Sequence, residues 1–410
     1  MSEGIATRRL DQEDALRLQF ESEITAHASH QGRPSLILRA SAFYPESGGQ
    51  MADLGTLEDA TERLRVVDVQ IENGLVHHIV EGSLPRVGES LQGQIDATRR
   101  RTHMALHTGQ HMLSAALAMH ASAETVSSRL GESGCTLDVD RDGLTARVLD
   151  ECEKLVNDVI DEDRPVRAFF PSAEELDGMH LRRTPLGSLV SLSGKHEGRV
   201  RVVDIAGFDI TPCGGTHVLH TSQIGMLRVE GFERYKGGTR IHFSAGRRAR
   251  RTLFEHDTLL RDLARRLETA ALSLPDALTR LQGASQELRT ELGKQASIVA
   301  SLLAEQIRKS QSGRVRVHLL REGGKELARL VADQLSKDAH TLNVVLVSLG
   351  EDAHIVIARG PDSADDCKAL FAELAKRTGG KGGGRPERAE GNAPNAELAL
   401  TQVRELVSLG

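Results

Sequence analysis

The amino-acid sequence predicts an α+β protein built from four successive parts. Short strands and turns fill the N-terminal region, and the spacing of apolar residues changes to a helical period near residue 100. A glycine-poor stretch rich in Leu, Arg, Glu and Ala follows, and strands alternate with helices after residue 313. The expected parts are a small β-barrel (1–97), an α+β core (98–248), a long helical hairpin (249–311) and a C-terminal α/β domain (312–410).

The barrel and the α+β core are expected from a change in pattern. Apolar runs at 35–39, 65–71 and 75–80 are separated by Gly, Pro, Asn and acidic residues, as in a small all-β region. A second helix is expected over 150–162 before Pro165, and strand-like runs at 199–205 and 240–243 lead to an end near Gly246. The first helix of the core is indicated by Leu106, Met112, Leu113, Ala116, Leu117 and His120.

The helical hairpin is expected from a heptad-like repeat that Ser285 and Gln295 interrupt. Pro275 divides the stretch and suits an early position of the second arm, with Ser273 near its cap. The apolar seam could pair the two arms or two subunits. Its members are Leu278, Leu281, Leu288, Leu292, Val299 and Leu302.

The C-terminal domain is expected to contain strands at 315–320, 344–349 and 355–358. Helices are expected at 324–337, 364–377 and about 396–408. A glycine-rich turn at 379–385 precedes the last helix.

Composition excludes several classes of protein. No apolar run approaches the ~18 residues of a membrane span, and residues 1–9 hold no secretory apolar block. The four cysteines show no C-x-x-C pair and no disulfide framework, which favours a reducing cytosol. Only 3% of residues are aromatic and none is Trp, so stacking on unpaired bases is not expected.

The net charge of -6 does not by itself indicate a nucleic-acid binder, but basic residues gather in three clusters. One lies at 99–101, one at 247–251 and one at 376–388. Such clusters can neutralise phosphates, or they can be solvated helix faces. Arg100, Arg247, Lys381 and Arg385 are the candidate contacts.

The first motif of chemical interest is H-x-x-x-H, formed by His107 and His111 inside the expected helix. Four residues advance about 6 Å and one turn, so both imidazoles project from one face. Two nitrogens placed in this way can bind one metal ion. Alone, the spacing is a weak signal.

The second motif, Cys-Gly-Gly-Thr-His, runs from Cys213 to His217. The glycines permit a tight turn, and a thiolate with an imidazole adds two further metal ligands. His107, His111, Cys213 and His217 together make a credible tetrahedral zinc set. The alternative is a small buried cysteine beside a hydrogen-bonded loop histidine.

A third segment, Phe-Tyr-Pro-Glu-Ser-Gly-Gly-Gln at 43–50, lies in the expected barrel. A loop with two glycines can bring the amide of Gln50 close to a ligand, where it donates and accepts hydrogen bonds. Without further context, the segment is simply a tight turn.

In this order, the three motifs resemble the editing domain of alanyl-tRNA synthetase and its free-standing relatives, the AlaX proteins. The run 379–387 also resembles the glycine-rich signature that closes alanyl-tRNA synthetases. The resemblance covers essentially the whole chain and corresponds to the long type of AlaX. One departure is Ser47, where the synthetases commonly have glycine.

The resemblance implies a zinc-dependent hydrolase of mischarged alanine tRNA, with Ser-tRNA(Ala) as substrate and Gly-tRNA(Ala) as a second candidate. The residues 98–248 are then the editing domain, and the zinc ligands are His107, His111, Cys213 and His217. Gln50 is expected beside the aminoacyl group or its attacking water, so Gln50, His107 and His111 are assigned to catalysis. A site of three ligands and a water molecule stays open.

Serine must be accepted and alanine spared, so a buried polar group that binds the serine hydroxyl is expected. Ser127, Ser128 or Thr216 could supply this group, although such residues often bond only to the backbone. Gln50, Ser127 and Thr216 are the predicted substrate contacts.

The expected partner is tRNA(Ala) charged with serine or glycine, and no membrane is involved. The barrel begins almost at residue 1 and leaves no room for an upstream ATP-binding domain. The chain is therefore predicted to act in the cytoplasm on tRNA charged elsewhere. Lys381 and Arg385 are expected to contact tRNA from a glycine-rich loop, although that loop could be a mere connector. A homodimer through the helical hairpin or the C-terminal domain is a further expectation.

Three alternatives compete with this interpretation. A threonyl-type editing hydrolase uses a related pair of metal motifs, but segment 43–50 and the terminal glycines favour alanine. A non-catalytic, tRNA-binding scaffold would use the zinc for structure only. A phosphodiesterase is disfavoured because the acidic D-H-H metal motif is missing.

Overall fold

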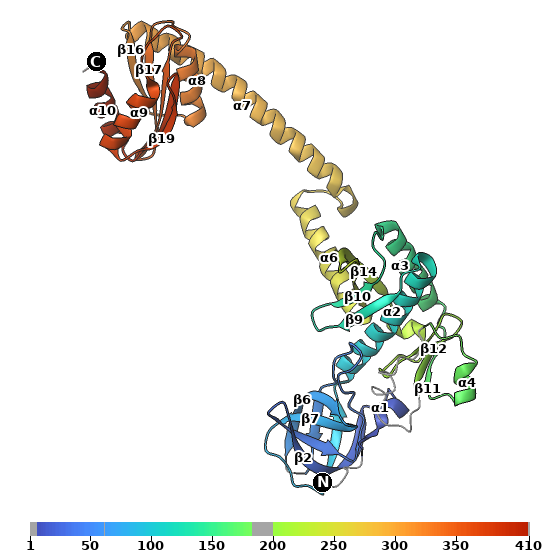
Figure 1. The fold of residues 1–410 in the computed structure, drawn as a ribbon. Coiled ribbons are helices and arrows are strands. Elements are labelled where there is room, and N and C mark those ends of the chain that lie inside the picture. Colours follow the sequence, from blue (N-terminus) through green and yellow to red (C-terminus); the bar gives the residue numbers. More distant parts are fainter. Residues whose placement is uncertain (1–5, 61, 183–199, 409–410) are drawn as a thin grey trace. The chain divides into compact units, whose positions relative to one another are not determined.

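The computed structural model describes residues 6–60, 62–182 and 200–408. They form two compact units, Met1–Leu260 and Arg261–Gly410. The α+β class is confirmed, and so is the N-terminal barrel (Figure 1). Among the described helices, none combines the length and apolar character that crossing a bilayer demands.

The N-terminal strands close into a barrel around a core of Leu, Ile, Val and Phe side chains. Asn73 and Gly74 form one tight turn with positive φ angles of 50° and 80°, as a two-residue hairpin of this twist requires. The short strands β1 (Arg8–Arg9) and β4 (Ala40–Ser41) pair outside the barrel, beside α1 (Leu10–Glu13). The barrel strands, in order around it, are β2 (Gln19–His30), β3 (Arg33–Leu38), β7 (Leu75–Glu81), β6 (Arg63–Glu72), β5 (Gly55–Glu58) and β8 (Ser90–Ile95).

Helix α2 (Ala97–Ala121) follows the barrel and is the predicted carrier of H-x-x-x-H. Asp96 caps its N-terminus by accepting hydrogen bonds from the backbone amides of Thr98 and Arg99. The helix ends at Ser122, which adopts the left-handed conformation. Most side chains between Met104 and Leu117 are buried, so α2 is the central helix of the unit.

Two sheets surround α2. One has the order β14-β15-β10-β9 and the other β11-β12-β13. Helix α3 (Ala146–Asp161) begins four residues earlier than predicted because Thr145 caps it, and residue 199 of a predicted strand lies outside the described residues. The remaining elements are β9 (Thr125–Leu130), β10 (Cys135–Val139), β11 (Val166–Phe169), α4 (Ala173–Asp177), β12 (Val202–Ile205), β13 (Asp209–Pro212), η1 (Thr221–Ile224), β14 (Leu227–Tyr235) and β15 (Gly238–Ala245).

The long helical region consists of α6 (Gly246–Arg266), a short turn η2 (Ala271–Ser273) and α7 (Leu274–Ser310). Pro275 lies in the first turn of α7, as predicted. The leucines of the heptad seam are exposed, from 50% at Leu278 to 65% at Leu288. The division between the units falls within α6, so the pairing of two arms as a hairpin stays a prediction.

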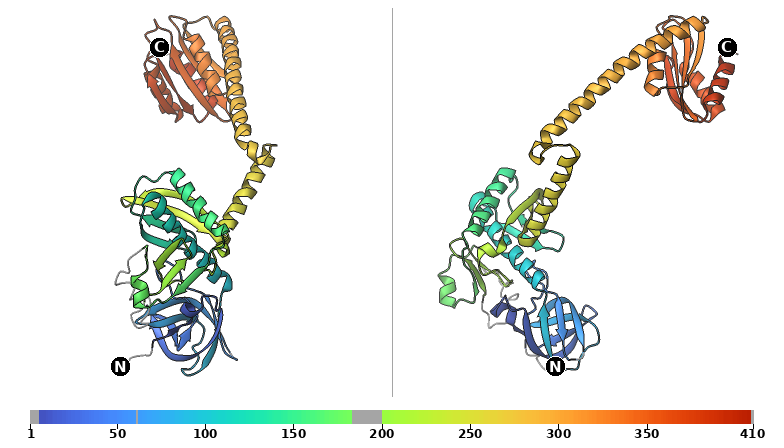
Figure 2. Two further views of the ribbon diagram at one scale, coloured as in Figure 1. Left: turned by 90° about the vertical axis from the view of Figure 1, so that its right-hand side faces the viewer. Right: turned by 180° about the vertical axis from the view of Figure 1, so that it is seen from behind.

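The C-terminal unit contains a five-stranded sheet with the order β16-β17-β18-β20-β19. Helix α8 and the end of α7 cover one face, and α9 and α10 cover the other (Figures 1 and 2). The strands are β16 (Val315–Leu320), β17 (Leu342–Leu349), β18 (Asp352–Arg359), β19 (Lys381–Arg385) and β20 (Arg388–Ala393). The helices are α8 (Lys325–Leu335), α9 (Cys367–Thr378) and α10 (Ala396–Ser408).

The prediction of a glycine-rich loop at 379–385 is wrong in one respect. Residues Lys381–Arg385 form the edge strand β19, paired antiparallel with β20. A Cβ atom on Gly382 would lie 2.7 Å from the ring of Phe371 in α9, so the strand needs glycine to pack against this helix. Pattern alone suggests a loop because a strand of glycines carries no apolar alternation.

Candidate metal centre

The two metal motifs, about a hundred residues apart in the chain, meet in the first unit. His107 and His111 lie on α2, and Cys213 and His217 lie on the turn after β13. One ligand atom from each of the four residues lies within 4.8 Å of all the others. The Cys213 Sγ atom is 3.5 Å from His107 Nε2 and 3.4 Å from His217 Nε2. The spacing of four along α2 thus places both imidazoles on one face, as predicted.

The outer nitrogen of each imidazole faces a neighbouring polar group. His107 Nδ1 donates to Gln50 Oε1 at 2.7 Å, and His217 Nδ1 donates to Thr108 Oγ1 at 3.2 Å. His111 Nδ1 is 3.7 Å from an oxygen of Asp209. A proton held on Nδ1 leaves Nε2 to bind a cation. The groups around the three imidazoles therefore leave their inner nitrogens directed at the middle of the cluster, as a bound metal ion requires.

The charges of the cluster also suit a soft divalent metal. Burial alone would raise the pKa of the Cys213 thiol, but the three imidazoles around it hold that pKa well below its usual value. Burial lowers the pKa of His217 to about 3, so this ring is neutral at physiological pH. Burial opposes the charged form of His111 as well, yet Cys213 and Asp209 raise its pKa. A thiolate and neutral imidazoles are the forms that bind zinc.

The Cys-Gly-Gly-Thr-His turn is held by a residue that the sequence analysis missed. Arg201 is buried, and its Nη1 atom donates to the carbonyl groups of Cys213 and Gly215 at 3.0 and 2.8 Å. A Cβ atom on Gly215 would lie only 2.1 Å from the His107 ring. Only glycine allows the turn to approach α2 this closely. The Gly-Gly pair was a visible signal for this approach, whereas Arg201 carried none.

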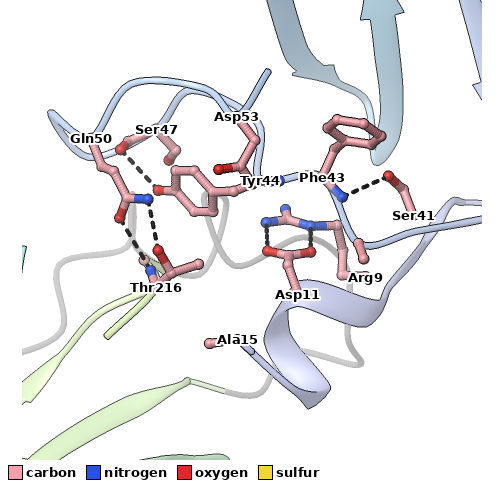
Figure 3. Close-up of polar contacts among 12 residues, drawn as sticks. Arg9, Asp11, Ala15, Ser41, Phe43, Tyr44, Ser47, Gln50, Asp53 and Thr216 are labelled. Carbon is pink, nitrogen blue, oxygen red and sulfur yellow. Dashed lines mark hydrogen bonds and ion pairs between the residues drawn. The ribbon is translucent and has the colours of Figure 1, made fainter. Parts of the chain in front are cut away.

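Segment 43–50 brings Gln50 to the cluster, where it contacts His107. Figure 3 shows the Gln50 side chain pointing toward Thr216 of the Cys-Gly-Gly-Thr-His turn. The Gln50 amide is fully buried, and its nitrogen donates to Thr216 Oγ1 at 2.8 Å. Its oxygen accepts from the Thr216 backbone amide as well as from His107. A Cβ atom on Gly49, whose φ is 84°, would meet the Ser128 carbonyl oxygen at 2.4 Å. Gln50 thus orients a candidate metal ligand and is not among the residues that line the adjoining pocket.

A pocket of about 170 Å³ opens beside the cluster. Arg182 lies on its wall and forms a bidentate ion pair with Asp209 at 2.6 and 3.0 Å, so Asp209 joins the pocket to His111. Sequence reasoning missed Arg182 and Asp209, because no local pattern distinguishes them. The described lining residues are Tyr44, Ser47, Gly48, His107, Gln110, His111, Ser128, Arg182, Thr211, Pro212, Cys213, Gly214 and Gly215.

Ser127 was predicted to bind the hydroxyl of the substrate's serine, and this prediction is wrong because Ser127 does not line the pocket. Its hydroxyl donates to Asp138 at 2.8 Å on the exposed side of β9, away from the pocket. Neighbouring residues of a strand face opposite sides, so Ser128 lines the pocket instead. Thr216 is buried behind the cluster, where its hydroxyl accepts from Gln50.

The prediction that Arg100 contacts tRNA is also wrong. Its guanidinium is fully buried, and it donates to both carboxylate oxygens of Asp53 and to the carbonyl groups of Ala15 and Ala42. The Arg100 guanidinium is therefore paired with groups inside the protein and is not accessible to a phosphate of tRNA. Arg247, by contrast, is exposed at the start of α6. Lys381 and Arg385 are exposed on β19 in the second unit, so these three residues stay candidate tRNA contacts.

Two protein families match parts of the chain. Residues 9–99, which contain the barrel, match the class II (A) tRNA synthetases. Residues 200–242, which contain the Cys-Gly-Gly-Thr-His turn, match the second additional domain of threonyl and alanyl tRNA synthetases.

Curated relatives extend over nearly the whole chain. An alanine–tRNA ligase from Thermococcus kodakarensis is 31% identical over 98% of the chain and 44% of its own length. The ligases from Halorubrum lacusprofundi and Methanopyrus kandleri are 30% and 28% identical, over 95% and 96% of the chain and 42% and 43% of their own lengths. The chain thus spans less than half the length of these relatives. A solved C-Ala domain of Aquifex aeolicus alanyl-tRNA synthetase aligns with 23% of the chain and 90% of its own, at 22% identity and a TM-score of 0.22.

Proposed function

This chain is related to the alanyl-tRNA ligases over nearly its whole length, and from this relation we propose that it hydrolyses the ester bond of mischarged tRNA(Ala). The proposed substrates are Ser-tRNA(Ala) and Gly-tRNA(Ala). The observation that supports it most is the convergence of both metal motifs beside a small pocket. In this proposal a separate enzyme charges the tRNA in the cytoplasm, so amino-acid-dependent ATP–pyrophosphate exchange by the purified chain would contradict that part.

The donor set fits zinc, so His107, His111, Cys213 and His217 are the proposed ligands. A zinc ion there would polarise an ester carbonyl or lower the pKa of a water molecule. The other groups act through these ligands. Gln50 and Thr108 keep the protons of His107 and His217 on Nδ1, and Asp209 faces Nδ1 of His111.

Within the pocket, the polar side chains of Gln110 and Ser128 are proposed to receive the aminoacyl group. The Gln110 amide donates to Ser114 at 2.8 Å, which leaves its oxygen as an acceptor for the serine hydroxyl. Alanine has no hydroxyl and would leave that oxygen unpaired in a buried place, which disfavours its binding. Ser128 here replaces Ser127 as the strand residue of the pocket.

The tRNA is proposed to bind through exposed cations. Arg247 lies beside Arg250 and Arg251 at the start of α6. Lys381 and Arg385 are the candidates in the second unit. Such contacts weaken with rising salt, and removing residues after about 312 should weaken binding at every salt concentration.

The decisive assay incubates the chain with Ser-tRNA(Ala), Gly-tRNA(Ala), Ala-tRNA(Ala) and mischarged Ser-tRNA(Thr). Rapid hydrolysis of the first, with Ala-tRNA(Ala) spared, is expected. Preference for Ser-tRNA(Thr) would favour the threonyl-type alternative. A Cys213→Ala variant that stays folded and binds tRNA but hydrolyses nothing supports an enzyme, whereas unfolding of that variant supports a structural zinc in a scaffold.

A further inference from the structure

A second group of metal-ligand side chains lies on the barrel, away from the Cys213 cluster. His30 ends β2, Glu72 ends β6 and His77 lies on β7. One ligand atom from each lies within 4.8 Å of the other two. The flanking residue Val76 belongs to the barrel core, so His77, its neighbour along the strand, points to the outer face.

The two histidines are arranged as ligands and not as ordinary surface residues. His30 Nδ1 is buried without a hydrogen-bond partner among the described residues, although it lies 3.6 Å from a carboxylate oxygen of Glu72. His77 Nδ1 lies 3.1 Å from Ser35 Oγ, which is itself buried. If His77 Nδ1 donates a hydrogen bond to Ser35, Nε2 of His77 is free to bind a cation, as Nε2 of His107 is when Nδ1 donates to Gln50.

Charge and solvation favour a cation at this place. The His77 side chain is buried, so a cation bound there would be largely shielded from solvent. The imidazole rings of His30 and His77 have centroids 5.4 Å apart. The Glu72 carboxylate is largely exposed and can move toward the rings. Two imidazoles and a carboxylate are a common set for Zn²⁺ with a water molecule in the fourth position.

We propose that His30, Glu72 and His77 bind a divalent transition-metal ion of the zinc class. In the barrel, β2 and β6 are separated by β3 and β7 and share no backbone hydrogen bonds. A bound ion would therefore link the ends of two strands that are not otherwise paired. The ion would also provide a partner for the buried Nδ1 atom of His30. The Glu72 carboxylate, at 3.6 Å, is too far from this nitrogen to form a good hydrogen bond. Because none of these residues contributes to the Cys213 cluster, the proposal does not depend on the proposed function.

The test counts the Zn²⁺ bound by the full chain after equilibrium dialysis, with metal analysis, and follows the melting temperature as Zn²⁺ or Ni²⁺ is added. The wild-type chain should bind one equivalent more than His77→Gln or Glu72→Gln, and both variants should lose most of the metal-induced rise in melting temperature. Mg²⁺ should have no effect, since it binds imidazole poorly. Hydrolysis of Ser-tRNA(Ala) should be unchanged in both variants.

Glu81→Gln is the matched control, because Glu81 is an exposed carboxylate at the end of β7 that pairs with Arg65. Glu72→Gln removes an exposed carboxylate, so it keeps the test open if His77→Gln fails to fold. Equal zinc content in the wild-type chain and in Glu72→Gln would overturn the proposal. It would leave His30 and Glu72 as an ion pair only.

Discussion

Replacing Gln50 by Leu separates two roles that this residue could have. The substitution keeps the volume of the side chain but removes its three hydrogen bonds, to His107 Nδ1 and to the amide and hydroxyl of Thr216. If Gln50 orients His107, its loss should weaken zinc binding directly. If Gln50 instead acts on the aminoacyl group, zinc binding should be unaffected.

The size of the effect follows from the contacts. Loss of an outer partner of a metal-ligating histidine costs about 10- to 100-fold in metal affinity, which is about 1.4–2.7 kcal/mol. The buried amide of Thr216 and Nδ1 of His107 are both left without an acceptor, at about 1–3 kcal/mol each. Part of that cost appears as lower stability of the folded chain, so the melting temperature of the metal-free protein should fall as well.

The assay is competition for Zn²⁺ with a chromophoric chelator. Gln110→Leu is the matched control, since Gln110 is a buried glutamine of α2 whose side-chain nitrogen donates to Ser114. Gln50→Leu should bind zinc at least tenfold more weakly than Gln110→Leu. Unchanged zinc affinity together with slow hydrolysis would refute the role of Gln50 in positioning His107. It would indicate that Gln50 acts on the aminoacyl group instead.

Three further predictions concern single residues. Arg100→Leu should destabilise folding by about 3–5 kcal/mol in urea denaturation, because it strands the buried Asp53 carboxylate; a loss of tRNA affinity with normal stability would contradict this. The Arg240 hydrogen bond lowers the pKa of Asp138, so Asp138→Asn should cost about 1 kcal/mol above pH 4. This difference should shrink as the pH falls through the native pKa, and a gap that widens in acid would oppose the assignment. Gly215→Ala should displace the His107 ring and abolish tight zinc binding, whereas wild-type affinity would show that the turn can move.

Much of this architecture could be predicted from the sequence because it rests on local periodicity. The helical spacing of apolar residues from Leu106 to His120 and the position of Pro275 are local signals, and they correctly indicated α2 and the start of α7. The metal cluster could be predicted because the i, i+4 spacing of His107 and His111 fixes one face of a helix. Its convergence with the turn of Cys213 followed from chemistry, since four such ligands suit one ion.

What could not be predicted depends on tertiary partners. Three consecutive arginines at 99–101 point in three directions around a helix, and only Asp53 in the barrel decides that Arg100 is the buried one. Ser127 and Ser128 differ by the phase of one strand, which no neighbouring residue fixes. The strand β19 has no apolar alternation because glycine has no side chain, and it is recognised only from its pairing with β20 and from the close approach of Phe371 to Gly382.

The central claim is that the cation held by Cys213 and the three histidines is required for hydrolysis. The most direct measurement strips the chain with a chelator and follows Ser-tRNA(Ala) hydrolysis as Zn²⁺ is restored, in the wild-type chain and in Cys213→Ala. The stripped wild-type chain should be inactive and zinc should restore its rate, whereas Cys213→Ala should stay inactive while still binding tRNA. Full hydrolysis by the stripped chain, or zinc-independent activity in Cys213→Ala, would contradict this claim.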